Sequence, residues 1–265
     1  MRNRLSLDIL AQPDDTTCGP TCLHALYRYY GDDMPLERVI DETQRLRHGG
    51  TLAVLLAKHA MRRGYKVQIY TYNVHVFDPT WFEPGAGDMR DLLRAQIKRK
   101  RDARIRFASR AYIEFLDMGG EIYLRDLTRD LIRKHLDRGV PILTGLNATY
   151  LYREARERQR DGKPDPIGGE STGHFVVLSG YDREERTVSV ADPLESNPVS
   201  RTTSYDVDID RLMCSILLGI ATYDANLLII RPGDSKGSPS PAPTTKVARR
   251  KGAKGGKRAR ARRRQ

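Results

Sequence analysis

The spacing of apolar residues changes from helix-like to strand-like along the chain, and this change constrains the fold more than any other feature of the sequence. In the first half, apolar residues recur three and four positions apart, which is typical of helices that bury one face. We expect helices over residues 18–30, 35–46, 52–63, 88–116 and 127–136. The fourth is heavily charged, and we expect a break in it near Arg106.

Short apolar runs, most of them in the second half of the chain, have the alternation or the continuous burial of strands. We expect strands over residues 66–72, 140–146, 174–181, 187–191 and 227–230. The apolar run Ile216–Ala221 also suits a buried strand, and the polar, Gly- and Pro-containing stretch Arg153–Ser171 predicts an exposed insertion. Because helices mostly precede strands, the order favours an α+β domain over alternating βαβ units.

The net charge is confined to the C-terminal segment Ser235–Gln265. Of the 46 basic residues, 34 precede this segment and match the 34 acidic residues of the chain, so the net charge of +12 belongs to the segment alone. Its Ser/Pro-rich linker and Lys/Arg run cannot bury a core. We therefore expect one folded domain over residues 1–234 and a disordered basic tail over 235–265. The tail is either a solvated extension or a sequence-independent attractant for nucleic acid or another polyanion.

Features of an exported or membrane-spanning protein are missing from the sequence. The first residues are charged and lack the long apolar core of a signal peptide. No apolar run approaches the roughly 18 residues that cross a bilayer. Three cysteines without an export signal argue against a disulfide framework. We expect a reduced cytoplasmic protein with no membrane partner, and the Cys and His spacings suggest neither a metal nor a cofactor.

Cys18 is the first candidate for chemistry, because it falls at the start of the first expected helix. Only the thiolate attacks carbonyl groups well, and the dipole and free N–H groups of a helix start favour an anion. Gly19 would let a substrate backbone approach the thiol. Cys22 lies one helical turn further on, where we expect it to pack in the core. Taken alone, Cys18 also fits a buried packing residue.

His174 and Asp192 are the second and third candidates. His174 opens a very apolar strand directly after Gly173, so its ring can lie at the end of the strand, and Asp192 follows the next strand. If the two strands form a hairpin, the imidazole and the carboxylate meet at the same end. A carboxylate there would hold the imidazole tautomer and stabilise its charged form. Alone, each also fits a structural role, as a strand-capping histidine or a turn aspartate before proline.

Gln12 is the fourth candidate, in the loop that leads to the Cys18 helix. Its amide could join the backbone N–H of Cys18 in an oxyanion hole, which stabilises the charge that develops on an attacked carbonyl. A lone loop glutamine is usually solvated, so this role depends on the other three residues.

Taken together, these segments resemble the C39-type peptidases, which are papain-like cysteine peptidases. The similar region runs from about Leu5 to Ile230. The resemblance rests on Gln12, Cys18-Gly-Pro-Thr-Cys, Tyr29-Tyr-Gly31, Gly173-His-Phe-Val-Val-Leu and Val190-Ala-Asp-Pro193. It implies a papain-like fold, in which an N-terminal helical part packs on an antiparallel sheet with the active cleft between them.

The same resemblance implies thiol-dependent cleavage of a peptide or amide bond in a peptide or protein substrate, with Cys18, His174, Asp192 and Gln12 as the catalytic set. Two alternatives stay open. An acyl transferase would use the same nucleophile and pass the acyl group to an amine. A non-catalytic peptide-binding module would keep the cleft, with the basic tail docking it to a polyanion.

Overall fold

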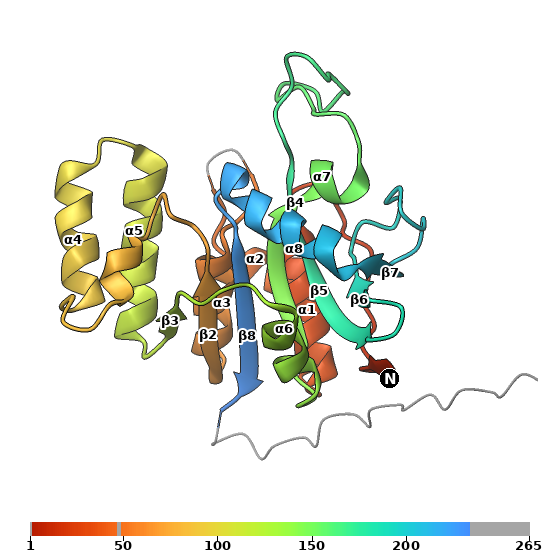
Figure 1. The fold of residues 1–265 in the computed structure, drawn as a ribbon, viewed down its shortest axis with the longest axis horizontal. Coiled ribbons are helices and arrows are strands. Elements are labelled where there is room, and N and C mark those ends of the chain that lie inside the picture. The colour runs from red at the N-terminus through yellow and green to blue at the C-terminus, as the bar shows by residue number, and fades with distance from the viewer. Residues whose placement is uncertain (1, 47–48, 234–265) are drawn as a thin grey trace, which may run out of the picture.

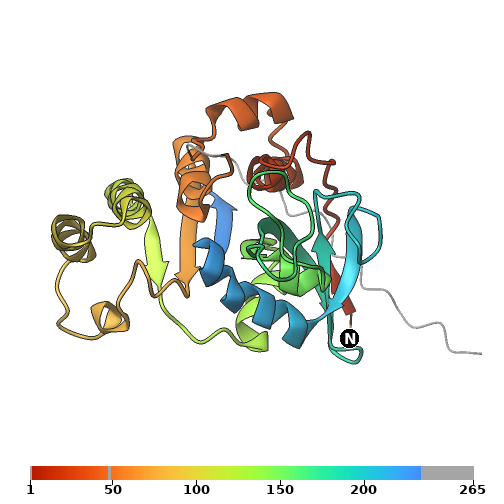
Figure 2. The same ribbon diagram turned by 90° about the horizontal axis from the view of Figure 1, so that it is seen from above.

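One twisted sheet runs through the molecule, with helices on both of its faces (Figures 1 and 2). The computed structural model describes residues 2–46 and 49–233. The strands are β1 (Arg2–Arg4), β2 (Tyr65–Thr71), β3 (Glu121–Tyr123), β4 (Ile142–Asn147), β5 (Gly173–Asp182), β6 (Thr187–Ala191), β7 (Ser204–Asp208) and β8 (Asn226–Pro232). Their order in the sheet is β3-β2-β8-β4-β5-β6-β7, and β1 pairs with β5.

The sheet is antiparallel apart from one pair. Strands β2 and β3 run parallel, because a long helical crossover returns the chain to the same edge in the same direction. All other strand pairs in the described residues are antiparallel. The predicted antiparallel sheet is therefore confirmed, with β3 as an exception that the short segment Glu121–Tyr123 did not reveal in the sequence.

The helices divide between the two faces of the sheet. They are α1 (Cys18–Tyr29), α2 (Leu36–Glu42), α3 (Ala53–Arg62), α4 (Met89–Arg99), α5 (Ala103–Asp117), α6 (Arg129–Leu136), α7 (Ala148–Tyr152) and α8 (Ile209–Leu218), with 3-10 turns η1 (Pro79–Phe82) and η2 (Gly219–Thr222). One core packs α1, α2, α3 and α5 against the first face, and a second core packs α6 and α8 against the other. Figure 2 shows both layers with the sheet between them. The predicted α+β class, with an N-terminal helical part on the sheet, is confirmed.

Strand β5 is buried on both faces, which explains its continuous apolar run. Phe175 and Val177 belong to the core on the α1 side, whereas Val176 and Leu178 belong to the core on the α8 side. A strand covered by helices on both sides needs no polar alternation. Helix α1 packs against β5, so Cys18 and His174 begin two elements in direct contact.

Two predicted elements need correction, one helix and one strand. The charged region 88–116 does break, but between α4 and α5 at residues 100–102, because Asp102 caps α5 by accepting hydrogen bonds from the N–H groups of Arg104 and Ile105. The run Ile216–Ala221 is not a strand. Asp208 caps α8, whose residues Ile209, Leu212 and Ile216 are buried at helical spacing, and the run covers the end of that helix and most of η2.

The predicted exposed insertion Arg153–Ser171 is largely exposed, and Figure 1 shows it standing above the sheet next to α7. The proposed disordered tail, 235–265, lies outside the described residues. Among the residues that the structure describes, no helix is both long and apolar enough to cross a membrane.

Candidate active site

Cys18 is the first residue of α1, as its position before Pro20 predicted. Its residue is 9% exposed, so only a small part of it reaches the surface. Its thiol interacts with the ring of His174, because hydrogen bonding and charge from Cys18 are among the causes that raise the pKa of this imidazole. The first N–H groups of a helix have no intrahelical partners, so they are available to an anion at this position.

His174 lies at the start of β5 and contacts the residue that follows β6. Its Nε2 is 2.8 Å from Oδ1 of Asp192. The pairing of β5 with β6, in which Val177 lies opposite Ala191, brings the two side chains to the same end of the hairpin. Because Nε2 is used by Asp192, the other ring nitrogen, Nδ1, is the one left for the thiol of Cys18. The structure thus brings Cys18, His174 and Asp192 into one connected chain.

Asp192 is fully buried and its carboxylate is completely hydrogen-bonded. Oδ1 also accepts the backbone N–H of Leu194 at 2.9 Å. Oδ2 accepts the hydroxyls of Tyr152 and Tyr205, both at 2.7 Å. These two tyrosines were missed by the sequence reasoning. Each comes from an element remote in sequence, α7 and β7, and no local pattern marks a tyrosine as a carboxylate ligand.

The electrostatics favour a charged pair. Burial alone would lower the pKa of His174, but hydrogen bonds and charge attraction from Asp192 and Cys18 raise it to about 10. Burial alone would raise the pKa of Asp192, but its hydrogen bond to His174, the charge of that ring and the hydrogen bond from Tyr152 bring this pKa below its usual value. At neutral pH the imidazolium and the carboxylate are therefore the stable forms.

Cys22, in the same helix as Cys18, has the environment of a cysteine that only packs in the core. It is fully buried, its Sγ donates to the backbone oxygen of Phe175 at 3.2 Å, and burial raises the pKa of its thiol well above the usual value. Gly19 also serves packing, which corrects the expectation that it admits substrate. A Cβ on Gly19 would lie 2.8 Å from Cγ2 of Thr51 and 3.2 Å from a ring carbon of Phe175.

Gln12 reaches the same site from the loop before α1. Its backbone N–H donates to the oxygen of Pro193 at 2.9 Å, next to Asp192, and its Nε2 donates to the oxygen of Asp14 at 2.9 Å. Asp14 is held in turn by Thr16, whose N–H and hydroxyl both donate to Oδ1 at 2.7 Å. The buried Oε1 of Gln12 has no hydrogen-bond partner among the described residues.

A cavity of about 340 Å³ opens beside His174. Its lining includes Gln12, Asp15, Tyr152, Glu154, Glu157, Asp161, Gly173, His174 and Leu194. The insertion Arg153–Ser171 supplies one wall, and no lysine or arginine of the described residues lines the cavity. This is the space in which a substrate would meet the imidazole.

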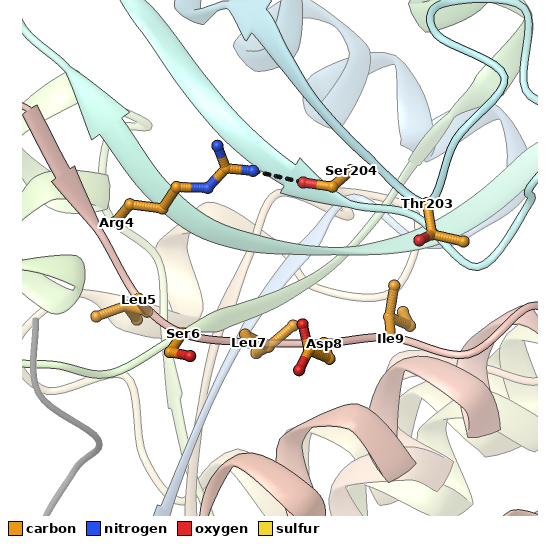
Figure 3. Close-up of a pocket in the computed structure, with 8 residues that line it drawn as sticks. All are labelled: Arg4, Leu5, Ser6, Leu7, Asp8, Ile9, Thr203 and Ser204. Carbon is orange, nitrogen blue, oxygen red and sulfur yellow. Dashed lines mark hydrogen bonds between the residues drawn. The ribbon is translucent and has the colours of Figure 1, made fainter. Parts of the chain in front are cut away.

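A second cavity, of about 480 Å³, lies between the segment Arg4–Ile9 and the start of β7 (Figure 3). Arg4 crosses it and donates to Oγ of Ser204 at 2.6 Å. None of Gln12, Cys18, His174 or Asp192 lines it, whereas Gln12 and His174, though not Cys18 or Asp192, line the cavity beside His174. We therefore assign the site to that cavity. No group of three or more His, Cys, Asp or Glu within residues 2–46 and 49–233 is placed to hold a metal ion.

Comparison with known proteins identifies one matching family model and several solved structures of similar fold. The model of the Peptidase C39 like family matches residues 4–211. Two solved structures overlay on most of this chain. A protein of Bacillus anthracis assigned as a C39-like peptidase is 14% identical and covers 87% of this chain and 97% of its own, with a TM-score of 0.48. Xylellain, a cysteine protease from Xylella fastidiosa, is 15% identical and covers 87% and 85%, with a TM-score of 0.42.

A curated protein of Caulobacter vibrioides, 4-hydroxy-3-methylbut-2-en-1-yl diphosphate synthase (flavodoxin), is 28% identical over 106 residues. The match spans 40% of this chain and 27% of that protein. The chain therefore covers only about a quarter of this relative, and the match supports no shared activity. The match to the family model, which spans more than half of the chain, is the informative one.

Proposed function

The chain belongs to the Peptidase C39 like family of papain-like cysteine peptidases, and we propose that it hydrolyses peptide or amide bonds with Cys18 as nucleophile, His174 as general base and acid, Asp192 as orienting carboxylate and Gln12 as oxyanion donor. The observation that carries this proposal is the buried chain of contacts from Cys18 through His174 to Asp192. A binding module needs no such chain of ionisable groups.

We propose the following reaction for this pair. In the resting site the thiol proton already lies on His174, and the thiolate Sγ of Cys18 attacks the carbonyl carbon of the substrate. The negative charge that develops on the carbonyl oxygen is stabilised by Nε2 of Gln12 and the backbone N–H of Cys18. His174 then protonates the leaving amine as the C–N bond breaks, which leaves an acyl-thioester on Cys18. Water, deprotonated by His174, attacks the thioester and releases the acid and the free thiol.

The hydrogen bonds of Gln12 support its role. The loop 12–17 is fixed at both ends, because Gln12 N–H donates to Pro193 and the hydroxyl of Thr17 donates to the oxygen of Asp14. One amide hydrogen of Nε2 is used by Asp14, and the second is free for a substrate oxygen. A fixed donor costs no reorganisation when charge develops in the transition state.

We propose in addition that the substrate carries positive charge near the bond that is cleaved. Asp15, Glu154 and Glu157 line the cavity beside His174, and none of the three forms an ion pair within the described part of the chain. Asp161 is excluded from this argument, because Arg158 pairs with it at 3.0 Å. Carboxylates without cationic partners attract lysine and arginine side chains.

Incubation with peptides tests the proposal. The full chain is mixed with a defined peptide mixture, with and without a primary amine, and products are identified by mass spectrometry. We expect free carboxyl ends at new termini, and no products with Cys18→Ala. The matched control, Cys214→Ala, removes an exposed thiol and keeps the activity. Predominant amide products with the added amine would instead assign an acyl transferase, and binding without cleavage would assign a binding module.

We propose that residues 1–234 form the peptidase domain, that the protein works in the cytoplasm, and that the segment 235–265 adds sequence-independent attraction to polyanions. All three cysteines are free thiols, which agrees with a reducing compartment. Localisation of a tagged chain in fractionated cells tests the compartment directly.

A further inference from the structure

The helical hairpin formed by α4 and α5 carries a concentrated positive charge that the peptidase proposal does not use. Figure 1 shows the hairpin beyond β3, at the edge of the sheet away from β7. The exposed basic residues between the middle of α4 and the middle of α5 are Arg94, Lys98, Arg99, Lys100, Arg101, Arg104 and Arg110. The basic run Lys98–Arg101 covers the end of α4 and the turn that follows it, and we call this run the hairpin turn cluster.

The hairpin turn cluster has no acidic partners. Within residues 2–46 and 49–233, none of its four residues forms an ion pair or a side-chain hydrogen bond. Asp102, the nearest acidic residue in sequence, caps α5 and is also 3.5 Å from the hydroxyl of Tyr223. Four consecutive positive charges held together without counterions favour a polyanionic partner.

A groove of about 450 Å³ begins at this cluster and contains aromatic rings. Its lining consists of Val74, His75, Asp78, Trp81, Leu92, Ala95, Gln96, Arg99 and Lys100. Trp81 is only partly buried against the core, and His75 is exposed. Val74 is an apolar side chain that is 56% exposed on the same wall. The groove therefore places the cationic side chains of Arg99 and Lys100 beside the rings of Trp81 and His75. Trp81 is the only tryptophan in the sequence.

The groove is built on a rigid floor. Nε2 of Gln96, on α4, donates to the oxygen of Val76 at 2.9 Å and to Oγ of Ser109 at 3.1 Å, so it ties the helix to the wall that carries His75. Phe77 packs edge-on against Tyr112 with ring centroids 4.7 Å apart. Asp78 is the single carboxylate in the lining, and it caps η1 by accepting the N–H and hydroxyl of Thr80.

We propose that this groove and the hairpin turn cluster bind single-stranded nucleic acid. Phosphates contact Arg99, Lys100 and their neighbours in the cluster, while bases stack on Trp81 and His75. The guanidinium of Arg104 lies 4.6 Å from the centre of the Tyr223 ring, a cation–π contact within the protein. The exposed ring of His75 and the partly exposed ring of Trp81 favour nucleic acid over an acidic peptide, because a carboxylate gains nothing from a flat apolar surface. The site is independent of the peptidase activity and of the tail.

The fluorescence of Trp81 provides a test, since the chain has no other tryptophan. The full chain is titrated with an oligothymidine at low salt. We expect quenching of the Trp81 emission that weakens as salt is added. The quadruple variant Lys98→Glu, Arg99→Glu, Lys100→Glu, Arg101→Glu should require roughly tenfold more oligonucleotide for the same quenching, because it removes phosphate contacts.

A matched variant separates the groove from the tail. Reversal of four charges in the tail (Arg258→Glu, Arg260→Glu, Arg262→Glu, Arg263→Glu) makes the same change in net charge and should keep the full amplitude of Trp81 quenching. Circular dichroism checks that both variants are folded. The proposal is overturned if oligothymidine binds without changing Trp81 emission, which would assign binding to the tail. It is also overturned if polyglutamate of equal charge quenches Trp81 equally well, which would assign an acidic protein partner.

Discussion

A buried carboxylate is costly unless its oxygens are hydrogen-bonded, and Asp192 satisfies this condition through groups from four separate parts of the chain. His174 and the N–H of Leu194 engage Oδ1, and the hydroxyls of Tyr152 and Tyr205 engage Oδ2. These bonds keep the carboxylate ionised and fix its direction. The imidazole is thereby held with one nitrogen toward Asp192 and the other toward Cys18, which is the arrangement that a general base requires.

Tyr205→Phe should weaken the site without touching the substrate cavity. Tyr205 donates to Asp192 but does not line the cavity, so we expect a lower kcat with KM nearly unchanged. The lost hydrogen bond to a charged group should cost about 1.5–3 kcal/mol of unfolding free energy. Urea denaturation and steady-state kinetics measure the two effects. Tyr150→Phe, which changes an exposed tyrosine, is the control and should alter neither quantity.

Asp192→Asn should change stability in a way that depends on pH. The pKa of His174 is raised from 6.5 to about 10, so the folded protein binds this proton more tightly than the unfolded chain. The resulting stabilisation is complete below pH 6.5 and is lost as pH rises toward 10, by on the order of 1 kcal/mol per pH unit. Because the neutral amide of the variant cannot attract the proton, its stability deficit should be largest near pH 6 and shrink toward pH 10. Urea titrations near pH 6 and pH 10 measure the loss of unfolding free energy in Asp192→Asn. An equal loss at both pH values would refute the charged pair of His174 and Asp192.

Three of the four candidate residues could be proposed from sequence because each lies at the boundary of a predicted helix or strand, and Gln12 was proposed from its place in the loop before the Cys18 helix. Cys18 precedes a helical period, and His174 and Asp192 flank two apolar runs. The hydroxyl partners of Asp192 could not be proposed, since Tyr152 and Tyr205 meet only when β6 and β7 pair and α7 folds back. The packing role of Gly19 was misjudged for the same reason, because Thr51 and Phe175 approach it only in the tertiary structure.

At the scale of elements, α1 is held against β5 by close packing at its first turn. Gly19 has no side chain to separate the helix from Thr51, Leu56 and Phe175. The start of the helix therefore sits close enough to the sheet for Cys18 to reach His174. The position of Cys18 therefore depends on the absence of one methyl group at residue 19.

Gly19→Ala should destabilise the fold by about 1–3 kcal/mol through overpacking. The double variant with Thr51→Ser removes the methyl group that the new Cβ would meet at 2.8 Å, and should recover part of the loss. The hydroxyl of residue 51, which donates to the oxygen of Gln44, is kept by this change. Thermal unfolding of Gly19→Ala, of the double variant and of Thr51→Ser alone gives the coupling free energy between the two substitutions. Strictly additive effects would show that the contact with Thr51 does not limit the helix position.

Most long helices and strands could be predicted from the periodicity of apolar residues. The errors lie in short segments whose secondary structure is determined by tertiary contacts. The strands β1 and β3 are short, and each pairs with a strand distant in sequence, whereas β7 pairs with β6, the strand before it. The end of α8 was taken for a strand because a short apolar run has no readable period. Asp208, which caps the start of α8, was the residue in the sequence that could have indicated a helix.

At the scale of the whole molecule, residues 1–234 carry no net charge, but their charges are segregated. Carboxylates of the loop before α1 and of the insertion Arg153–Ser171 line the cavity beside His174, and the hairpin turn cluster lies beyond the β3 edge of the sheet. The two regions would attract partners of opposite charge. A cationic substrate would be guided to the cavity and away from the hairpin.

Glu154→Gln with Glu157→Gln should reduce the preference for cationic substrates. We expect kcat/KM for a peptide with lysine or arginine near the cleaved bond to fall several-fold, while a neutral peptide of the same length is little affected. Added salt should lessen the difference between the two peptides in the original chain. The control Glu83→Gln removes an exposed carboxylate that lies outside the cavity lining. An equal loss for both peptides would contradict a charge-based preference.

The central claim is that Cys18 is an activated thiolate paired with His174. The most direct measurement is the rate of alkylation by iodoacetamide near pH 6, followed residue by residue by mass spectrometry, with Cys214 as the internal reference. Cys214 is exposed and Cys18 is buried, so accessibility alone favours Cys214. The account predicts that Cys18 reacts faster and that His174→Ala removes this advantage. If Cys18 reacts no faster than Cys214, the account is contradicted.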